Sequence, residues 1–214
     1  MSVFRACPAQ FKYKFIDKLP EPKSPAMQRG NDLHKDLDAY LKKDKKTVPA
    51  VLKATIHPLV LEEYKLYRAS KTMASELQLA VTNEWTRTGW FDKDVWLRVV
   101  LDVVRVDGKV LIMGDHKTGQ IRPDQHAEQL EIYGAIGPAF WPGMSEIRGE
   151  MYYVDQNAAP AVHVYKPKDV PRLRKKWSAL AAPMFKAKTF KAVPGQACRY
   201  CAFSGRRGGL CDKG

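Results

Sequence analysis

Two aspartates and a lysine stand near one another in largely apolar sequence. Asp102 lies inside the apolar run 99–104, and Asp115 precedes Lys117 by two residues. A carboxylate in apolar surroundings is costly unless it is paired or bound to a metal. Two converging carboxylates can hold a divalent cation, and a neighbouring lysine can orient its water or stabilise developing negative charge. The three residues therefore predict a hydrolytic metal site. The alternative is a salt bridge between Lys117 and one aspartate.

A β-hairpin is the element that would bring the two aspartates together. Residues 95–106 are rich in β-branched residues, Asp107-Gly108 is a favoured two-residue turn, and residues 109–113 form the return strand. In that register Asp102 and Asp115 share one face as diagonal neighbours, roughly 7–8 Å apart. Lys117 continues on the same face if the strand persists.

The remaining pattern predicts an α/β fold in which helices flank a mixed central sheet. Residues 17–30 read as a loop. The expected helices are 30–42, 58–70, 124–136 (with Asp124 as a candidate N-cap) and 169–187. The further expected strands are 73–86, which contains Glu76, 147–155 and 161–166.

The composition indicates the class of protein and the kind of partner that it binds. The chain has 214 residues, 45% of them hydrophobic, so we expect one globular domain over 1–214. Its 36 Lys+Arg against 23 Asp+Glu favour a polyanion such as nucleic acid, and Arg206 and Arg207 could contact phosphates. No run is long and apolar enough to span a membrane, and no secretory signal opens the chain, which predicts a cytoplasmic protein.

The segment 114–119 has some resemblance to a phosphate-binding loop. That interpretation fails because His116 stands where the loop requires glycine directly before the lysine. We therefore expect no ATP site.

The four cysteines fall at the two ends of the chain: Cys7, Cys198, Cys201 and Cys211. Disulfides are not expected in a reducing compartment. Four thiolates could hold Zn²⁺ by ligand count, and the alternative is four unligated thiols.

Several short motifs resemble one known family. Asp115-His116-Lys117 looks like the (D/E)-x-K element of the PD-(D/E)XK nucleases, with Asp102 as the upstream aspartate. Gly30 to His34 is similar to the G-x-x-x-H element of the RecB-like branch, and Gln129 to Tyr133 is similar to its Q-x-x-x-Y element. The elements occur in the family's order over about residues 30 to 133.

This resemblance implies a restriction-endonuclease-like core and a role for each matching residue. His34, Asp102 and Asp115 would be metal ligands, together with the carbonyl of His116. Lys117 would be catalytic. Gln129 and Tyr133 would hold the DNA backbone or Lys117, and Glu76 matches an acidic position that touches a second metal or water.

The cysteines carry a second resemblance. Cys7-Pro8 followed by Phe11 is similar to the opening of RecB-like nucleases, and the pattern of one early and three late cysteines resembles the 4Fe–4S clamp of CRISPR-associated and AddB-type exonucleases. The nine residues between Cys201 and Cys211 exceed the family's usual gap. The resemblance implies that a metal cluster joins the N-terminal Cys7 segment to a small C-terminal cap over 188–214.

The sequence as a whole predicts a Mg²⁺- or Mn²⁺-dependent DNA exonuclease of a bacterial, archaeal or phage-infected cell. Its expected substrate is DNA with single-stranded or free ends. Recombination, repair, phage DNA metabolism and CRISPR adaptation all remain open as its process, as do a homo-oligomer and a recombination or CRISPR partner. The alternatives are a non-catalytic DNA-binding module on a degenerate nuclease fold and an RNA-processing nuclease of the same chemistry.

Overall fold

The computed structural model describes residues 1–22 and 24–213. The chain divides into two compact units, each described here by itself. The core unit is Pro25–Lys175, and the terminal unit joins Met1–Ser24 to Lys176–Gly214. Within the described residues, no helix has the length and apolar content needed to cross a membrane.

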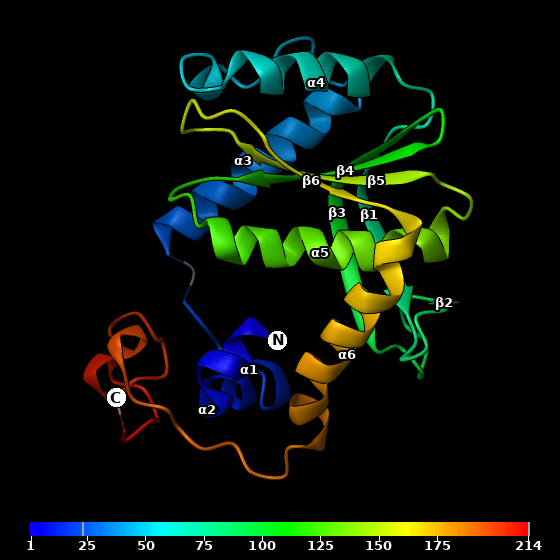
Figure 1. Cartoon of the computed structure of the whole chain (residues 1–214). Helices are drawn as coiled ribbons and strands as arrows, with labels where there is room; N and C mark the ends of the chain where they lie inside the picture. The colour runs from blue at the N-terminus through cyan, green and yellow to red at the C-terminus, as the bar shows by residue number, and fades with distance from the viewer. Residues whose placement is uncertain (23, 214) are drawn as a thin grey trace. The chain divides into compact units, whose positions relative to one another are not determined.

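A six-stranded mixed sheet forms the centre of the core unit (Figure 1). The strands lie in the order β2 (Arg87–Thr88), β1 (Ala74–Val81), β3 (Leu97–Asp107), β4 (Val110–Lys117), β5 (Glu146–Tyr153) and β6 (Ala161–Tyr165). Neighbouring strands are antiparallel except for β4 and β5, which are parallel. Helix α5 (Pro123–Phe140) makes the crossover between those two strands and covers one face, while α3 (Pro25–Leu41) and α4 (Pro58–Ala69) lie on the other. The predicted mixed sheet flanked by helices is confirmed.

Most predicted elements are present, with shifted ends. Helix α4 matches its predicted range, but α3 begins at Pro25, inside the predicted loop 17–30. Proline suits the first helical turn, where its missing N–H is not needed. The predicted strand 73–86 ends at Val81, because the chain turns back between Thr82 and Thr86. Asp124 is not the N-cap of α5; Arg122 is, and Asp124 lies in the first turn, where its charge favours the helix dipole.

The predicted turn of the central hairpin is wrong by one residue. Asp107 pairs with Val110, so the two-residue loop is Gly108-Lys109 rather than Asp107-Gly108. Gly108 has φ +57°, the left-handed value that a II′ turn requires at its first central position. One consequence is that the register shifts by two residues and Asp102 falls directly opposite Asp115, not diagonal to it. Strand alternation still predicts one face for the two aspartates in this register, because side chains alternate with a period of two.

Packing of α3 and α4 against the sheet fixes the elements that carry the site. Leu37 and Leu41 of α3 and Tyr64 and Tyr67 of α4 have no exposed surface, and all four belong to one core cluster with strand residues such as Val103. His34 lies one turn before Leu37 on the same stripe of α3 but remains half-buried. The buried stripe therefore sets the rotation of α3 and the direction of His34.

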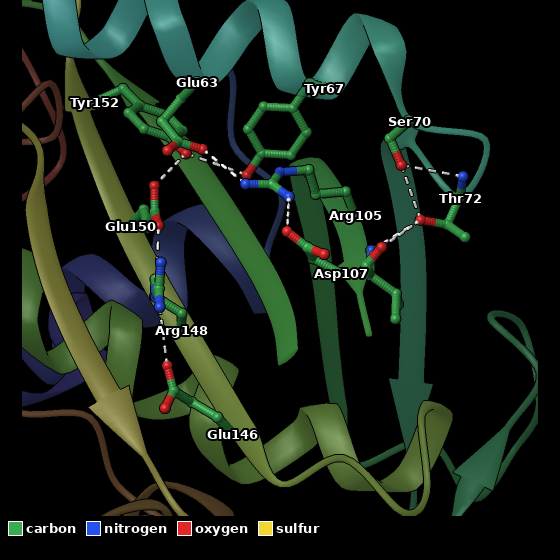
Figure 2. A network of polar contacts seen from close by, with 11 residues as sticks. Glu63, Tyr67, Ser70, Thr72, Arg105, Asp107, Glu146, Arg148, Glu150 and Tyr152 are labelled. Carbon is green, nitrogen blue, oxygen red and sulfur yellow. Dashed lines mark hydrogen bonds and ion pairs between the residues drawn. The ribbon is translucent and has the colours of Figure 1, made fainter. Parts of the chain in front are cut away.

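A polar network lies buried beneath α4 (Figure 2). Arg105 of β3 pairs with Glu63 of α4 at 3.1 Å. Tyr67 and Tyr152 are joined by a hydrogen bond of 3.1 Å between their hydroxyls, and Tyr152 donates to Glu150 at 2.6 Å. Glu150 is only 2% exposed, and Arg148 approaches it no closer than 4.0 Å. Burial raises the pKa of Glu150, with a further increase from Glu63, against opposing contributions from the Tyr152 hydrogen bond, Arg148 and Arg105.

We expect Glu150→Gln to stabilise the protein at neutral pH. A carboxyl whose folded pKa is raised contributes its full stability below its ordinary value of 4.5 and loses it as the pH rises. Glutamine still accepts the Tyr152 hydrogen bond and cannot ionise. Urea unfolding at several pH values should show the variant more stable near pH 7 and equal to the parent below about pH 4.5.

The matched control is Glu146→Gln on the same strand. Hydrogen bonds from Lys166 and Arg148 lower the pKa of Glu146, so this change should destabilise the protein at neutral pH, and its effect should vanish on acidification. If both substitutions changed the free energy of unfolding at neutral pH in the same direction, the raised pKa of Glu150 would be contradicted.

The terminal unit is built from short helices of both chain ends. Helices α1 (Ser2–Ala6) and α2 (Pro8–Phe11) lead into a π-helical turn, Lys12–Ile16. Helix α6 (Val170–Lys186) runs from the core unit into this one, followed by the 3₁₀ turns Gln196–Arg199 and Gly205–Arg207. Phe4, Phe11 and Phe190 pack as aromatic neighbours, with ring centroids 5.5–6.3 Å apart. Ala9 N also donates to Lys191 O at 3.3 Å, so the two ends are held together by backbone as well as by rings.

Candidate active site

The Asp115 carboxylate is the most contacted group of the candidate site. It is 3% exposed on β4, and Gln129 and Tyr133 of α5 both reach its Oδ1 atom, Tyr133 OH at 2.9 Å. Its Oδ2 atom contacts Nζ of Lys117. Burial raises the pKa of Asp115, and the neighbouring Asp102 charge raises it further, against the Lys117 ammonium. The side chains of Gln129 and Tyr133, expected on one helix, therefore contact Asp115 of the predicted D-x-K element.

Asp102 occupies the opposite strand and gathers two imidazoles. Its Oδ2 atom accepts the backbone N–H of His116 at 2.6 Å and lies 3.4 Å from Nδ1 of His34. The Nδ1 atom of His116 is 3.7 Å from the same oxygen. Burial alone would raise the pKa of Asp102, but the His34 hydrogen bond and the two histidines outweigh it and lower that pKa. Asp102 is therefore ionised at neutral pH.

A close approach of α3 to the end of β4 brings His34 to this position. Gly30 has no side chain, and a Cβ atom there would lie 3.3 Å from Oγ1 of Thr118. Asp155 holds both segments, because it pairs with Arg29 at 2.7 Å and accepts the Gly119 N–H at 3.1 Å. The Gly30-to-His34 spacing therefore has a structural reason: the glycine permits the contact and the histidine uses it.

Glu76 continues the acidic row across the sheet. Ser75 pairs with Val103 and Leu77 with Leu101, so the residue between them stands opposite Asp102. Glu76 has φ +50°, a left-handed value that is strained for a non-glycine residue in a strand. Its side chain is exposed. Burial and the Asp102 charge raise its pKa.

The donor atoms of this cluster suit a divalent cation. Among the residues that the structure describes, His34, Asp102 and His116 offer ligand atoms within 4.8 Å of one another. Asp115 lies on the next strand of the hairpin, and its buried Oδ2 atom is contacted by Nζ of Lys117. The Asp102 charge raises the pKa of Asp115, so a divalent cation near both carboxylates would favour their ionised forms. Imidazole and carboxylate together are a common ligand set for such ions.

The His116 side chain is a feature that the sequence interpretation missed. It is 2% exposed, burial lowers its pKa to about 4, and its Nε2 atom has no hydrogen-bond partner among the described residues. Tyr64 packs edge-on to it with ring centroids 5.4 Å apart. We expected only its backbone carbonyl at the site. Strand alternation predicts that 116 faces away from 115, but the pattern does not reveal that α4 and α3 close over that face.

The four cysteines all belong to the terminal unit and line one cavity. Cys7, Cys198, Cys201 and Cys211 share its wall with Tyr13, Val193, Phe203 and Ser204. All four thiols are free and half-buried. The tertiary structure therefore brings the early cysteine to the three late ones. Arg206 and Arg207 are exposed residues of the same unit.

The core unit therefore has the architecture of a mixed α/β sheet with an acidic hairpin at its centre, flanked by a lysine and a histidine. A solved structure of similar fold is that of the protein SSO0001, with TM-score 0.50 and 16% identity, covering 99% of this chain and 84% of that one. A candidate exonuclease from Eubacterium rectale has TM-score 0.49 and 9% identity, covering 91% of this chain and 80% of its own. Comparison with curated proteins gives no match.

The family is shown by the sequence match itself. Residues 1–206 match the PD-(D/E)XK nuclease superfamily, so the match includes the acidic hairpin and three of the four cysteines. The chain belongs to the PD-(D/E)XK nuclease superfamily.

We expect a divalent metal to bind through His34 and Asp102. Because binding to the folded state stabilises it, Mn²⁺ at about 100 times its Kd should add about 2.7 kcal/mol to the free energy of unfolding. His34→Ala and Asp102→Asn should each weaken Mn²⁺ binding at least about tenfold, since even indirect partners of a metal ligand have effects of that size. Calorimetric titration and thermal unfolding with and without Mn²⁺ measure both quantities.

Asp32→Asn is the control, because Asp32 is an exposed carboxylate on the same helix as His34. It should leave Mn²⁺ binding unchanged. Equal Mn²⁺ affinity in Asp102→Asn and the parent would exclude this site.

Proposed function

We propose that this protein is a RecB-like, Mg²⁺- or Mn²⁺-dependent DNA exonuclease. The observation that carries the proposal is the pair Asp102 and Asp115, opposed across the hairpin with Lys117 on Asp115, in a chain of a nuclease superfamily. The ordered motifs from Gly30 to Tyr133 favour the RecB-like branch, and the net charge of +13 favours a polyanionic substrate.

In this proposal each residue has the role that the resemblance to the RecB-like branch implies. His34, Asp102 and Asp115, with the His116 carbonyl, would hold the metal, which would supply an activated water and stabilise negative charge. Lys117 would orient a water and stabilise the charge that develops on the phosphate. Gln129 and Tyr133 fix the Asp115 carboxylate through their two hydrogen bonds to Oδ1. Glu76, exposed in the same row, is placed to contact a second metal or a water.

The RecB-like assignment favours DNA with free ends as the substrate. Arg206 and Arg207 would contact its phosphates. Recombination, repair, phage DNA metabolism and CRISPR adaptation all generate such ends. A partner protein or a second copy of the chain would select among these processes.

The cleavage test compares end-labelled linear DNA, closed circular DNA and RNA in Mn²⁺ or Mg²⁺. Linear DNA should be degraded, and Asp115→Asn and Lys117→Met should each lower the rate at least ~10²-fold, the scale for loss of one transition-state stabiliser. Tyr133→Phe should lower it only about tenfold, because it removes one hydrogen bond to Asp115. Asp32→Asn serves as the control again.

The outcomes separate the rival functions. If the parent protein binds DNA but shows no cleavage that depends on Asp115 or Lys117, the protein is a non-catalytic DNA-binding module. Rapid cutting of closed circles would replace the exonuclease by an endonuclease, and preference for RNA would favour the RNA-processing alternative.

We further propose that the four cysteines hold a 4Fe–4S cluster. All four sulfurs line one cavity, yet the close ligand group among the described residues is His34, Asp102 and His116, not a set of cysteines. A tetrahedral zinc site with Zn–S bonds of about 2.3 Å needs sulfurs closer than 4 Å. A cluster binds each thiolate to a different iron and accommodates a wider arrangement. The resemblance of the cysteine pattern to the iron–sulfur exonucleases ranks a cluster above mononuclear zinc.

Metal analysis after anaerobic purification tests this assignment. The parent should contain about four iron atoms and four sulfides per chain and absorb in the visible range, and Cys198→Ala should lose both. Colourless protein with one zinc per chain would replace the cluster by zinc. Protein with neither metal would leave four ordinary thiols.

A further inference from the structure

Ser204 stands in the wall of the cysteine cavity with an unused hydroxyl. The residue is 1% exposed, and its Oγ atom has no hydrogen-bond partner among the described residues. A buried hydroxyl without a partner costs roughly 1–3 kcal/mol. The cavity wall around it is otherwise formed largely by cysteines and apolar residues such as Val193 and Phe203. Such surroundings favour a sulfur atom as the acceptor.

The backbone fixes Ser204 between two of the cysteines. Its N–H donates to Cys201 O at 3.2 Å, and its backbone forms a β-bridge with Cys211. Its carbonyl accepts the N–H groups of Arg207 and Gly209, both at 2.9 Å. The backbone groups of Ser204 are therefore used, and only the side-chain hydroxyl is left.

The loop that follows presses this segment into place. A Cβ atom at Gly209 would lie 2.3 Å from the backbone carbon of Phe203, so glycine alone permits the approach. Cys211 N donates to Phe203 O at 2.8 Å, and Gly205 N donates to Cys211 O at 2.9 Å. The long spacing between Cys201 and Cys211 thus contains a compact loop that returns Cys211 to Ser204.

We infer that the Ser204 hydroxyl donates a hydrogen bond to a sulfur of the cluster held by the four cysteines. This inference rests on the iron–sulfur assignment of the proposed function. A hydrogen bond to an anionic sulfur stabilises the more negative, reduced state, so it raises the reduction potential of the cluster. Ser204 is a positioning residue that tunes the cluster, and it is not a ligand of iron.

The test is potentiometry on anaerobically purified protein, followed by the electron paramagnetic resonance signal of the reduced cluster. Ser204→Ala should shift the potential to more negative values. Ser204→Thr and Ser204→Val form a matched pair, because both add the same bulk and only threonine keeps a hydroxyl. Threonine should preserve the parent's potential, while valine should shift it like alanine. Ser2→Ala, at an exposed serine of the same unit, should have no effect.

The outcomes separate this inference from the iron–sulfur assignment. A parent protein with zinc or no metal overturns both. A parent with a cluster and unchanged potentials in all variants overturns the role of Ser204 alone. Equal shifts, or equal loss of the cluster, in the threonine and valine variants also overturn it, because bulk and not the hydroxyl would then be decisive. Loss of the cluster in alanine and valine with retention in threonine supports it.

Discussion

Burial of two facing carboxylates is the constraint on which the core unit depends. Asp102 and Asp115 follow the last pair of one hairpin, Val103 with Gly114, and a buried charge is costly unless other groups compensate it. Compensation comes from several elements at once. Lys117 lies on the same strand as Asp115, Gln129 and Tyr133 come from α5, and His34 comes from α3. Helices α3 and α5 therefore do more than cover the sheet, since each brings a polar group to one of the two aspartates.

The two aspartates of the site differ in the direction of their pKa shifts. The pKa of Asp102 is lowered by its two histidines, whereas burial and the Asp102 charge raise the pKa of Asp115. Asp115 accepts hydrogen bonds from the neutral donors Gln129 and Tyr133 and is also paired with Lys117. Lys117 and a divalent cation would both favour the ionised form of Asp115.

The two ends of the chain obey a different constraint. Apart from the part of α6 that belongs to it, the terminal unit consists mainly of short helices and 3₁₀ turns, which bury little apolar surface. The four thiols line one cavity, so a metal group bound to all of them would link the two ends of the chain. In the proposed function a metal cluster closes the unit, and its stability becomes coupled to the chemistry of those sulfurs.

The amphipathic helix 58–70 and the strand rich in β-branched residues could be recognised from sequence, because their patterns are local. Details that depend on one backbone angle could not. Gly108 takes its positive φ one position earlier in the loop than predicted, which changes the register by two residues. Pro25 opens a helix where the sequence indicated a loop, because proline is compatible with both.

By itself, the sequence determined the residue types and their order. It also predicted one face for Asp102, Asp115 and Lys117, because strand alternation is a property of neighbouring residues. Only the tertiary structure decided what closes over them. His116 lies beside Asp102 because α3 and α4 pack over that face. Ser204 lies between Cys201 and Cys211 because a glycine loop folds back. Both arise from contacts between distant segments, which no local pattern specifies.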